Sequence, residues 1–108
     1  MRLPELTHLQ FLILSILLNG DRSGRVVRDA LETEGAKKSP AAFYQLMARM
    51  EEAGHVEGWY EQSVIDEVPV KQRWYKITGH GITAWENTRA FYTNPGVPIF
   101  INPGLQGA

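Results

Sequence analysis

The chain has 108 residues, a formal net charge of −1, 44% hydrophobic residues and 21% charged residues. This length predicts a single domain, and the composition is that of a folded globular protein. The absence of cysteine excludes a disulfide framework, a thiolate zinc site and a cysteine nucleophile, and we expect a cytoplasmic protein. Because the net charge is close to zero, any binding to nucleic acid must depend on local clusters of positive charge.

The first predicted helix starts after an N-cap at Thr7 and runs to about Leu18, where Asn19 and Gly20 end it. Its sequence is apolar almost all round, so we expect this helix to be covered on more than one side. The stretch is too short to cross a bilayer and has no A-x-A cleavage site. We therefore expect neither a membrane span nor a signal peptide.

A second predicted helix covers residues 23–34, and Arg22, Arg25 and Arg28 recur along one side of it at every third position. Such a row could contact phosphates, or it could be a solvated face that pairs with neighbouring carboxylates. A short connection leads from this helix to the next one. The order of helix, short turn and helix is typical of a helix-turn-helix unit.

The third predicted helix, residues 40–53, is the one around which the chain is organised. Ser39 can act as its N-cap, Pro40 suits the first helical position, and Gly54 can adopt the left-handed conformation that ends it. The residues predicted to form its buried stripe follow helical spacing: Phe43, Leu46, Met47 and Met50.

The opposite side of this helix carries small and hydrogen-bonding residues, namely Ala41, Tyr44, Gln45, Ala48 and Arg49. Small residues let a backbone approach another molecule closely, and the longer side chains can meet a base or a phosphate. We interpret this side as the working surface. The alternative is an ordinary amphipathic helix with a solvated back.

After Gly54 the hydrophobic period changes from 3.6 to 2, which predicts a hairpin. Its strands are predicted at residues 56–64 and 70–77, and its turn at residues 65–69. The residues expected to point inward are Val56, Tyr60, Tyr75 and Ile77. Lys71 and Arg73 would decorate the rim, whereas Asp66 and Glu67 at the tip oppose a phosphate-binding role there.

Thr78 can cap a last helix over residues 79–92, whose apolar residues cover a wide arc. The arc includes Trp85 and Phe91 and exceeds what one core contact needs. From residue 93 the sequence contains NPG twice, and we predict a Pro/Gly-rich tail over residues 93–108 that is extended or partly disordered.

Three motifs carry a resemblance to a known family: Gly24-Arg25, Ala41-Ala42-Phe43-Tyr44, and Tyr75-Lys76-Ile77-Thr78 with Gly81. Together with Glu52-Ala53-Gly54, they resemble the winged-helix domain of PadR-family transcriptional regulators, especially the short members, over about residues 6–92. Two features depart from the family pattern. Arg25 stands where the family has an aromatic residue, and the hairpin tip is longer and more acidic than the usual basic tip.

The resemblance implies an α+β, mostly helical fold: a winged helix-turn-helix with three helices, a two-stranded β wing and a C-terminal dimerisation helix. The winged-helix domain would span residues 1–92. The resemblance also implies a homodimeric DNA-binding regulator, commonly a repressor released by a small aromatic or otherwise apolar effector. A twofold dimer would hold two recognition helices about one DNA turn apart, so we expect it to read a palindromic operator.

The expected DNA contacts come from the third helix and the wing: Ser39, Ala41, Tyr44, Gln45, Arg49, Lys71 and Arg73. Gln45 could pair bidentately with adenine, and Arg49 could reach a base or a phosphate. The surplus apolar faces of the first and last helices predict a twofold interface between subunits. The residues expected at this dimer and effector seam are Leu14, Leu18, Trp85 and Phe91, with Trp85 nearest the twofold axis.

We expect no enzyme activity, no metal and no cofactor. His8, His55 and His80 lie in different predicted elements without ligand spacing. Glu51 and Glu52 diverge on a helix, so they predict a solvated face. The alternative function is a winged-helix module that binds another protein without sequence-specific DNA binding, which the acidic tip and the near-neutral charge favour.

Overall fold

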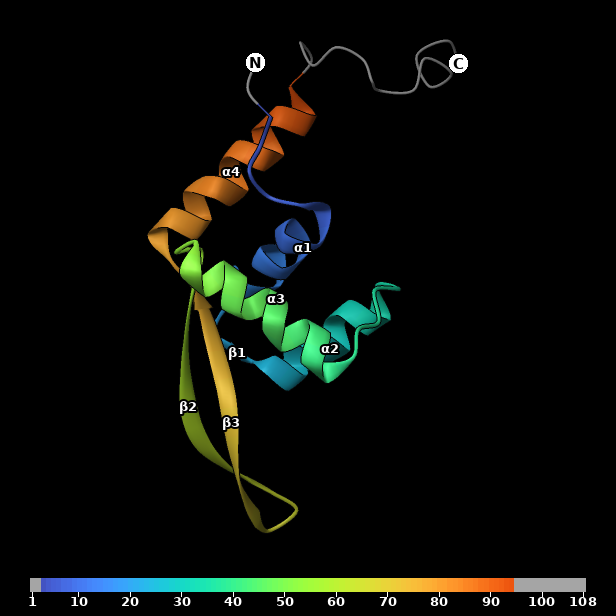
Figure 1. The fold of residues 1–108 in the computed structure, drawn as a ribbon, viewed down its shortest axis with the longest axis vertical. Helices are drawn as coiled ribbons and strands as arrows, with labels where there is room; N and C mark the ends of the chain where they lie inside the picture. Colours follow the sequence, from blue (N-terminus) through green and yellow to red (C-terminus); the bar gives the residue numbers. More distant parts are fainter. Residues whose placement is uncertain (1–2, 95–108) are drawn as a thin grey trace.

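The computed structural model describes residues 3–94 and contains within them four helices and a three-stranded antiparallel sheet (Figure 1). The elements in chain order are α1 (His8–Leu17), β1 (Arg22–Ser23), α2 (Gly24–Thr33), α3 (Pro40–Glu52), β2 (Val56–Ile65), β3 (Val68–Ile77) and α4 (Gly79–Thr93). The predicted α+β, mostly helical fold class is confirmed. The predicted tail lies outside the described residues except for Thr93, which ends α4, and Asn94.

Local signals in the sequence set the helix boundaries. The Thr7 side chain accepts a hydrogen bond from the Gln10 amide, and the Gln10 side chain accepts one from the Thr7 amide, which forms a capping box for α1. The Ser39 side chain accepts a hydrogen bond of 3.2 Å from the Ala42 amide at the start of α3. Gly54 follows α3 with a φ of 80°, as a left-handed helix stop requires.

The core lies between α1, α2, α3 and the base of the sheet. It contains Leu6, Ile13, Leu14, Leu17, Val27, Leu31, Phe43, Leu46, Met47, Met50, Val56 and Tyr75. α1 packs against α2, α4 and β3, which explains why a helix that is apolar almost all round is stable here. Leu14 is 0% exposed, so the prediction that it lies at a seam between subunits is wrong.

The two-residue strand β1 was not predicted from the sequence. Arg22 pairs with Tyr75, and Ser23 pairs with Trp74, which makes β3 the central strand in the order β1-β3-β2. Arg22 therefore leaves the predicted arginine row, and its guanidinium donates to the carbonyls of Asp21 and Asn19 instead. A strand of this length is stabilised by its pairing, which local sequence patterns do not report.

The tip of the hairpin is tighter than predicted. β2 and β3 extend to Ile65 and Val68, and only Asp66 and Glu67 lie between them, with φ values of 51° and 65°. Two central residues with positive φ are typical of the type I′ turn that matches strand twist. The predicted turn over residues 65–69 is thus wrong, because Pro69 continues β3 opposite Val64.

Two aromatic side chains differ from their predicted positions. Tyr60 is 62% exposed in the middle of β2, opposite Arg73. Trp85 points inward against α1: its ring stacks on Phe11 at 5.6 Å, and its Nε1 donates to Ser15 Oγ at 2.8 Å. None of the helices within residues 3–94 is long and apolar enough to cross a membrane.

Candidate nucleic-acid interface

The two faces of α3 differ completely in exposure. Phe43, Met47 and Met50 are 0% exposed, and Leu46 is 6% exposed. The opposite face carries the exposed residues Ala41, Tyr44, Gln45, Ala48 and Arg49, as the sequence predicts. This face is a ridge of small residues with an amide and a guanidinium, held in one orientation by the buried side.

Ser39 precedes this ridge, and Tyr44 is its one aromatic member. Ser39 is exposed at the start of α3, but its hydroxyl already serves as the N-cap. Tyr44 is 37% exposed, and its ring meets the Phe43 ring edge-on at 5.0 Å. The hydroxyl end of the Tyr44 ring lies against Gly24 at the start of α2, where a Cβ would overlap it.

The two basic candidates of the wing have different surroundings. Lys71 is exposed, with its ammonium 5.1 Å from the centre of the Tyr60 ring. The guanidinium carbon of Arg73 lies 4.7 Å from the centre of the same ring, and Arg73 Nη2 donates to Glu51 Oε1 at 2.7 Å. Burial lowers the pKa of Arg73, but the charge and hydrogen bond of Glu51 and the neighbouring Tyr75 raise it, and the net shift is upward. Arg73 is therefore committed to a partner, whereas Lys71 is available.

The position of Glu51 differs from the one predicted from the sequence. The predicted solvated face is wrong for Glu51, whose side chain is 27% exposed and joins α3 to β3 through Arg73. The partner lies 22 residues further along the chain, so no helical spacing could reveal the pair. Tyr75 lies next to this pair, and burial raises the pKa of its phenol to about 12.

The structure also brings together two histidines that the sequence places apart. The His55 and His80 rings stack at 5.0 Å, and Glu5 approaches His55 at 3.9 Å between Oε2 and Nε2. His8, in contrast, is exposed at the start of α1. Burial and the neighbouring His80 lower the pKa of His55, while Glu5 raises it, and the net shift is downward. The prediction that the histidines do not converge is wrong for this pair.

Arranged in this way, α2, α3 and the β2–β3 hairpin form a winged helix-turn-helix with α3 in the position of the recognition helix (Figure 1). No model of a protein family matches the sequence, and no curated protein does. Solved structures, however, match it over most of its length.

A PadR-like transcriptional regulator from Bacillus cereus is 25% identical, with 93% of each chain covered and a TM-score of 0.72. A PadR-family regulator from Clostridium difficile is 18% identical, with 94% of this chain and 97% of that chain covered and a TM-score of 0.71. PadR of Bacillus subtilis, solved in complex with operator DNA, is 13% identical, with 94% of this chain and 57% of that chain covered and a TM-score of 0.65.

The chain has the winged-helix fold of PadR-family transcriptional regulators, and the resemblance seen in the sequence is confirmed at the level of the fold. These neighbours are transcriptional regulators, and the prediction that the chain is not an enzyme agrees with them.

The pair of Glu51 and Arg73 generates a prediction about stability. Glu51→Ala should lower the free energy of unfolding by about 1 kcal/mol, because it leaves a partly buried guanidinium without its carboxylate. Glu52→Ala is the matched control at an exposed position next to it and should change stability by less than about 0.5 kcal/mol. Urea unfolding followed by circular dichroism measures both, and equal values for the two variants would contradict the role assigned to the pair.

Proposed function

We propose that this chain is a DNA-binding transcriptional regulator of PadR type that acts in the cytoplasm as a homodimeric repressor. The observation that carries the proposal is the exposed ridge of α3, whose other side is anchored in the core. A helix exposed in this way can enter a major groove, while the wing lies along the DNA backbone. The operator complex of Bacillus subtilis PadR, which has this fold, supports the proposal.

The residues of the ridge have separate roles in this proposal. Gln45 pairs bidentately with an adenine, and Arg49 reaches a guanine edge or a phosphate. Ala41 lets the start of α3 approach the groove closely, and Ser39 and Tyr44 contact backbone phosphates. Phosphate contacts fix the register of the protein on the duplex, and base contacts provide the sequence preference.

The proposed dimer uses the apolar surface that remains exposed on one protomer. Leu18 is 39%, Ile82 37% and Tyr92 64% exposed, and Phe91 is half-buried near the end of α4. The second half of α4 projects past the helical core (Figure 1). Pairing of these surfaces around a twofold axis would hold two α3 helices about one DNA turn apart, ~34 Å, and suit a palindrome. Trp85 contributes by packing α4 on α1.

An effector site is proposed beside this surface. A hollow of about 290 Å³ is lined by Leu6, Thr7, His8, Phe11, Thr88 and Tyr92. Its size and its apolar and aromatic walls suit a small aromatic or apolar molecule. Since α1 and α4 both line the hollow, an occupant would alter the packing of the helix that forms the dimer.

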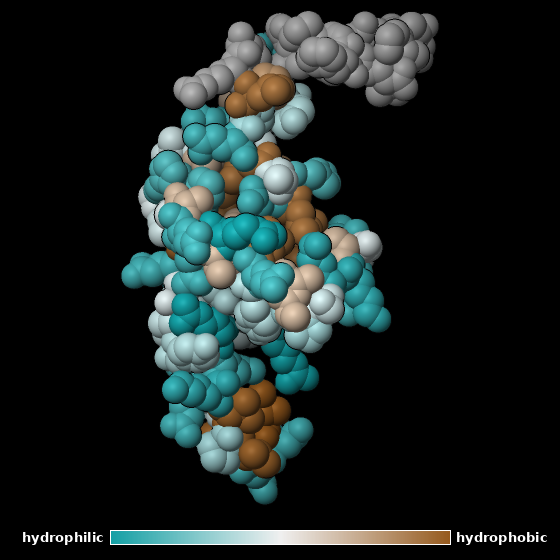
Figure 2. Space-filling model, viewed as in Figure 1, coloured by the Kyte–Doolittle hydropathy of each residue, from teal (hydrophilic) through white to brown (hydrophobic). Residues whose placement is uncertain are grey.

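A second candidate function is a protein-interaction module with the same fold. The wing tip favours it, because Val64 and Val68 are 71% and 57% exposed next to the acidic turn. An apolar patch at the end of the hairpin is visible in Figure 2. In the first function the α3 ridge binds DNA. In the second, the chain binds another protein and the ridge has no sequence-specific contact with DNA.

Replacement of the ridge residues tests the proposed reading surface. Gln45→Ala should cost about 1–3 kcal/mol of binding and relax the preference at one base pair, and Arg49→Ala should weaken binding as well. Arg89→Ala, at an exposed arginine on α4, is the matched control and should bind like the parent. Fluorescence anisotropy with DNA from the upstream region of the encoding gene measures all three. Parental binding by folded Gln45→Ala and Arg49→Ala would exclude this surface and favour the protein-interaction function.

The wing generates a prediction about salt dependence. Lys71→Ala should lower the slope of log K against log salt by about 0.9 for each lost phosphate contact, or ~1.8 for a dimer, without changing sequence preference. Lys37→Ala on the turn before α3 is the control for a general loss of charge. An unchanged slope for Lys71→Ala would mean that the acidic tip keeps the wing away from the DNA.

The exposed end of α4 generates a prediction about assembly. Sedimentation at micromolar concentration should show a dimer, and Tyr92→Glu should dissociate it because the substitution buries a charge in the interface. Tyr60→Glu is the matched control, since this tyrosine is 62% exposed on the wing, and it should remain dimeric. A folded monomer of the parent chain would end the argument for paired half-sites.

A further inference from the structure

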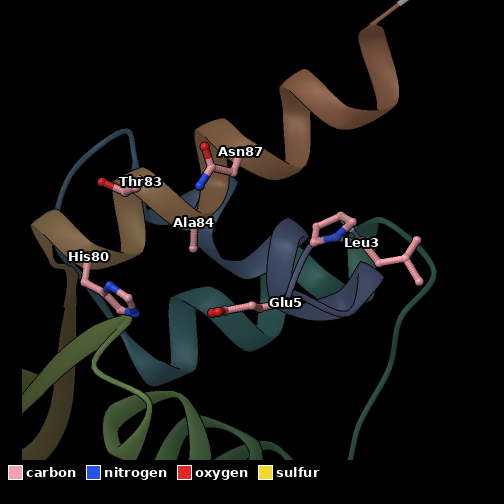
Figure 3. A pocket seen from close by; sticks show the side chains of 7 residues that line it. Leu3, Glu5, His80, Thr83, Ala84 and Asn87 are labelled. Carbon is pink, nitrogen blue, oxygen red and sulfur yellow. The ribbon is translucent and has the colours of Figure 1, made fainter. Parts of the chain in front are cut away.

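Three donor side chains from separate segments converge on one side of the molecule. Glu5 lies in the segment before α1, His55 in the turn between α3 and β2, and His80 in the first turn of α4. One ligand atom from each lies within 4.8 Å of the other two. Figure 3 shows the Glu5 carboxylate and the His80 ring directed toward each other beside a cavity of about 260 Å³.

His55 is an unusual residue for an ordinary core position. It is 5% exposed, and neither Nδ1 nor Nε2 has a hydrogen-bond partner among residues 3–94. The 3.9 Å between its Nε2 and Glu5 is too long for a hydrogen bond. A buried imidazole normally satisfies its N–H and its lone pair, because each unpaired polar atom keeps the cost of its lost hydration. Both ring nitrogens of His55 therefore lack a hydrogen-bond partner within residues 3–94, and they lie next to the ligand atoms of Glu5 and His80.

The backbone fixes the two histidines relative to each other. The Thr78 amide donates to the His55 carbonyl at 3.1 Å, and the Thr78 hydroxyl donates to the Gly54 carbonyl at 2.5 Å. Gly81 lies so close to this strand end that a Cβ there would overlap the His55 carbonyl oxygen. The end of α3 and the start of α4 are thus locked together, and the stacked rings follow from this packing.

We propose that Glu5, His55 and His80 form a binding site for a divalent first-row transition metal ion, with Zn²⁺ the best match. Two imidazole nitrogens and one carboxylate oxygen are a common zinc ligand set, and water completes the tetrahedron. Ca²⁺ and Mg²⁺ prefer all-oxygen sites and fit less well. Thr83 and Asn87 also line the cavity and can hydrogen-bond to that water.

The distances require only a small contraction. The centre of an equilateral triangle with sides of 4.8 Å lies about 2.8 Å from each corner, whereas Zn–N and Zn–O bonds are ~2.0–2.2 Å. Glu5 and His80 are exposed, so their side chains can move by the remaining ~0.7 Å without disturbing the core. The His80 ring must also rotate out of its parallel stack on His55, because an imidazole binds a metal ion in the plane of its ring. His55 supplies the fixed donor.

Such an ion would join three segments with different roles in the fold. It would connect the end of α3 to the start of α4 and hold the N-terminal segment against both. Ligands that bind only the folded state stabilise it. The site is independent of the proposed DNA binding, because none of its donors lies on the exposed ridge of α3.

Metal titration of the full chain, freed of any purification tag and treated with a chelator, tests the site. Zn²⁺ competed against a chromophoric chelator should give one ion per chain. Glu5→Gln and His80→Ala should each weaken binding by at least about tenfold, since each removes one of three donors. His8→Ala is the matched control, at an exposed histidine outside the cluster, and should bind like the parent.

Substitution of Co²⁺ gives a second readout, because four-coordinate Co²⁺ absorbs strongly in the visible range. The parent and His8→Ala should show this band, and His80→Ala should lose it. Glu5→Gln and His80→Ala, which change exposed residues of the site, should both remain folded when checked by circular dichroism. Substoichiometric binding by the parent, parental affinity of Glu5→Gln and His80→Ala, or loss of binding in His8→Ala would each overturn the proposal.

Discussion

The orientation of α3 depends on the burial of one side of this helix. Phe43, Met47 and Met50 are fully buried and Leu46 is nearly so, and burial of such side chains stabilises a fold by about 1.5–3 kcal/mol each. A helix anchored by four side chains on one face cannot rotate about its axis without exposing them. The ridge on the other face is therefore fixed toward solvent, and every function proposed for it depends on this constraint.

The base of the wing is held in place together with α3. β3 pairs with β1 and β2, and its residue Tyr75 is 2% exposed in the core. Arg73, two positions away on the same face of the strand, pairs with Glu51 on α3. The base of the wing and α3 consequently move as one body. Toward its tip, the β2–β3 hairpin extends past the helices (Figure 1), and the position of the tip depends on strand pairing alone.

The features that were predicted correctly from the sequence depend on residues that are close together in the chain. Caps at Thr7 and Ser39, the helix stop at Gly54 and the buried stripe of α3 follow from local hydrogen bonding and periodicity. The misplaced residues depend on contacts between distant segments. Trp85 stacks on α1, 70 residues away from its hydrogen-bond partner Ser15, and His55 meets His80 only because α4 begins against the end of α3. Patterns over short windows contain no information about such contacts.

The charge distribution of the wing indicates which part of it can approach DNA. Asp66 and Glu67 form the turn, and exposed Val64 and Val68 adjoin it, so the tip offers carboxylates and apolar surface where phosphates would need cations. Lys71 lies closer to the base, on the same face as Tyr60. A wing that follows the backbone would therefore do so with its middle, which brings the duplex nearer to α3. In the proposed complex with DNA, most of the binding would then fall to the ridge, and the apolar tip would remain free for a different contact.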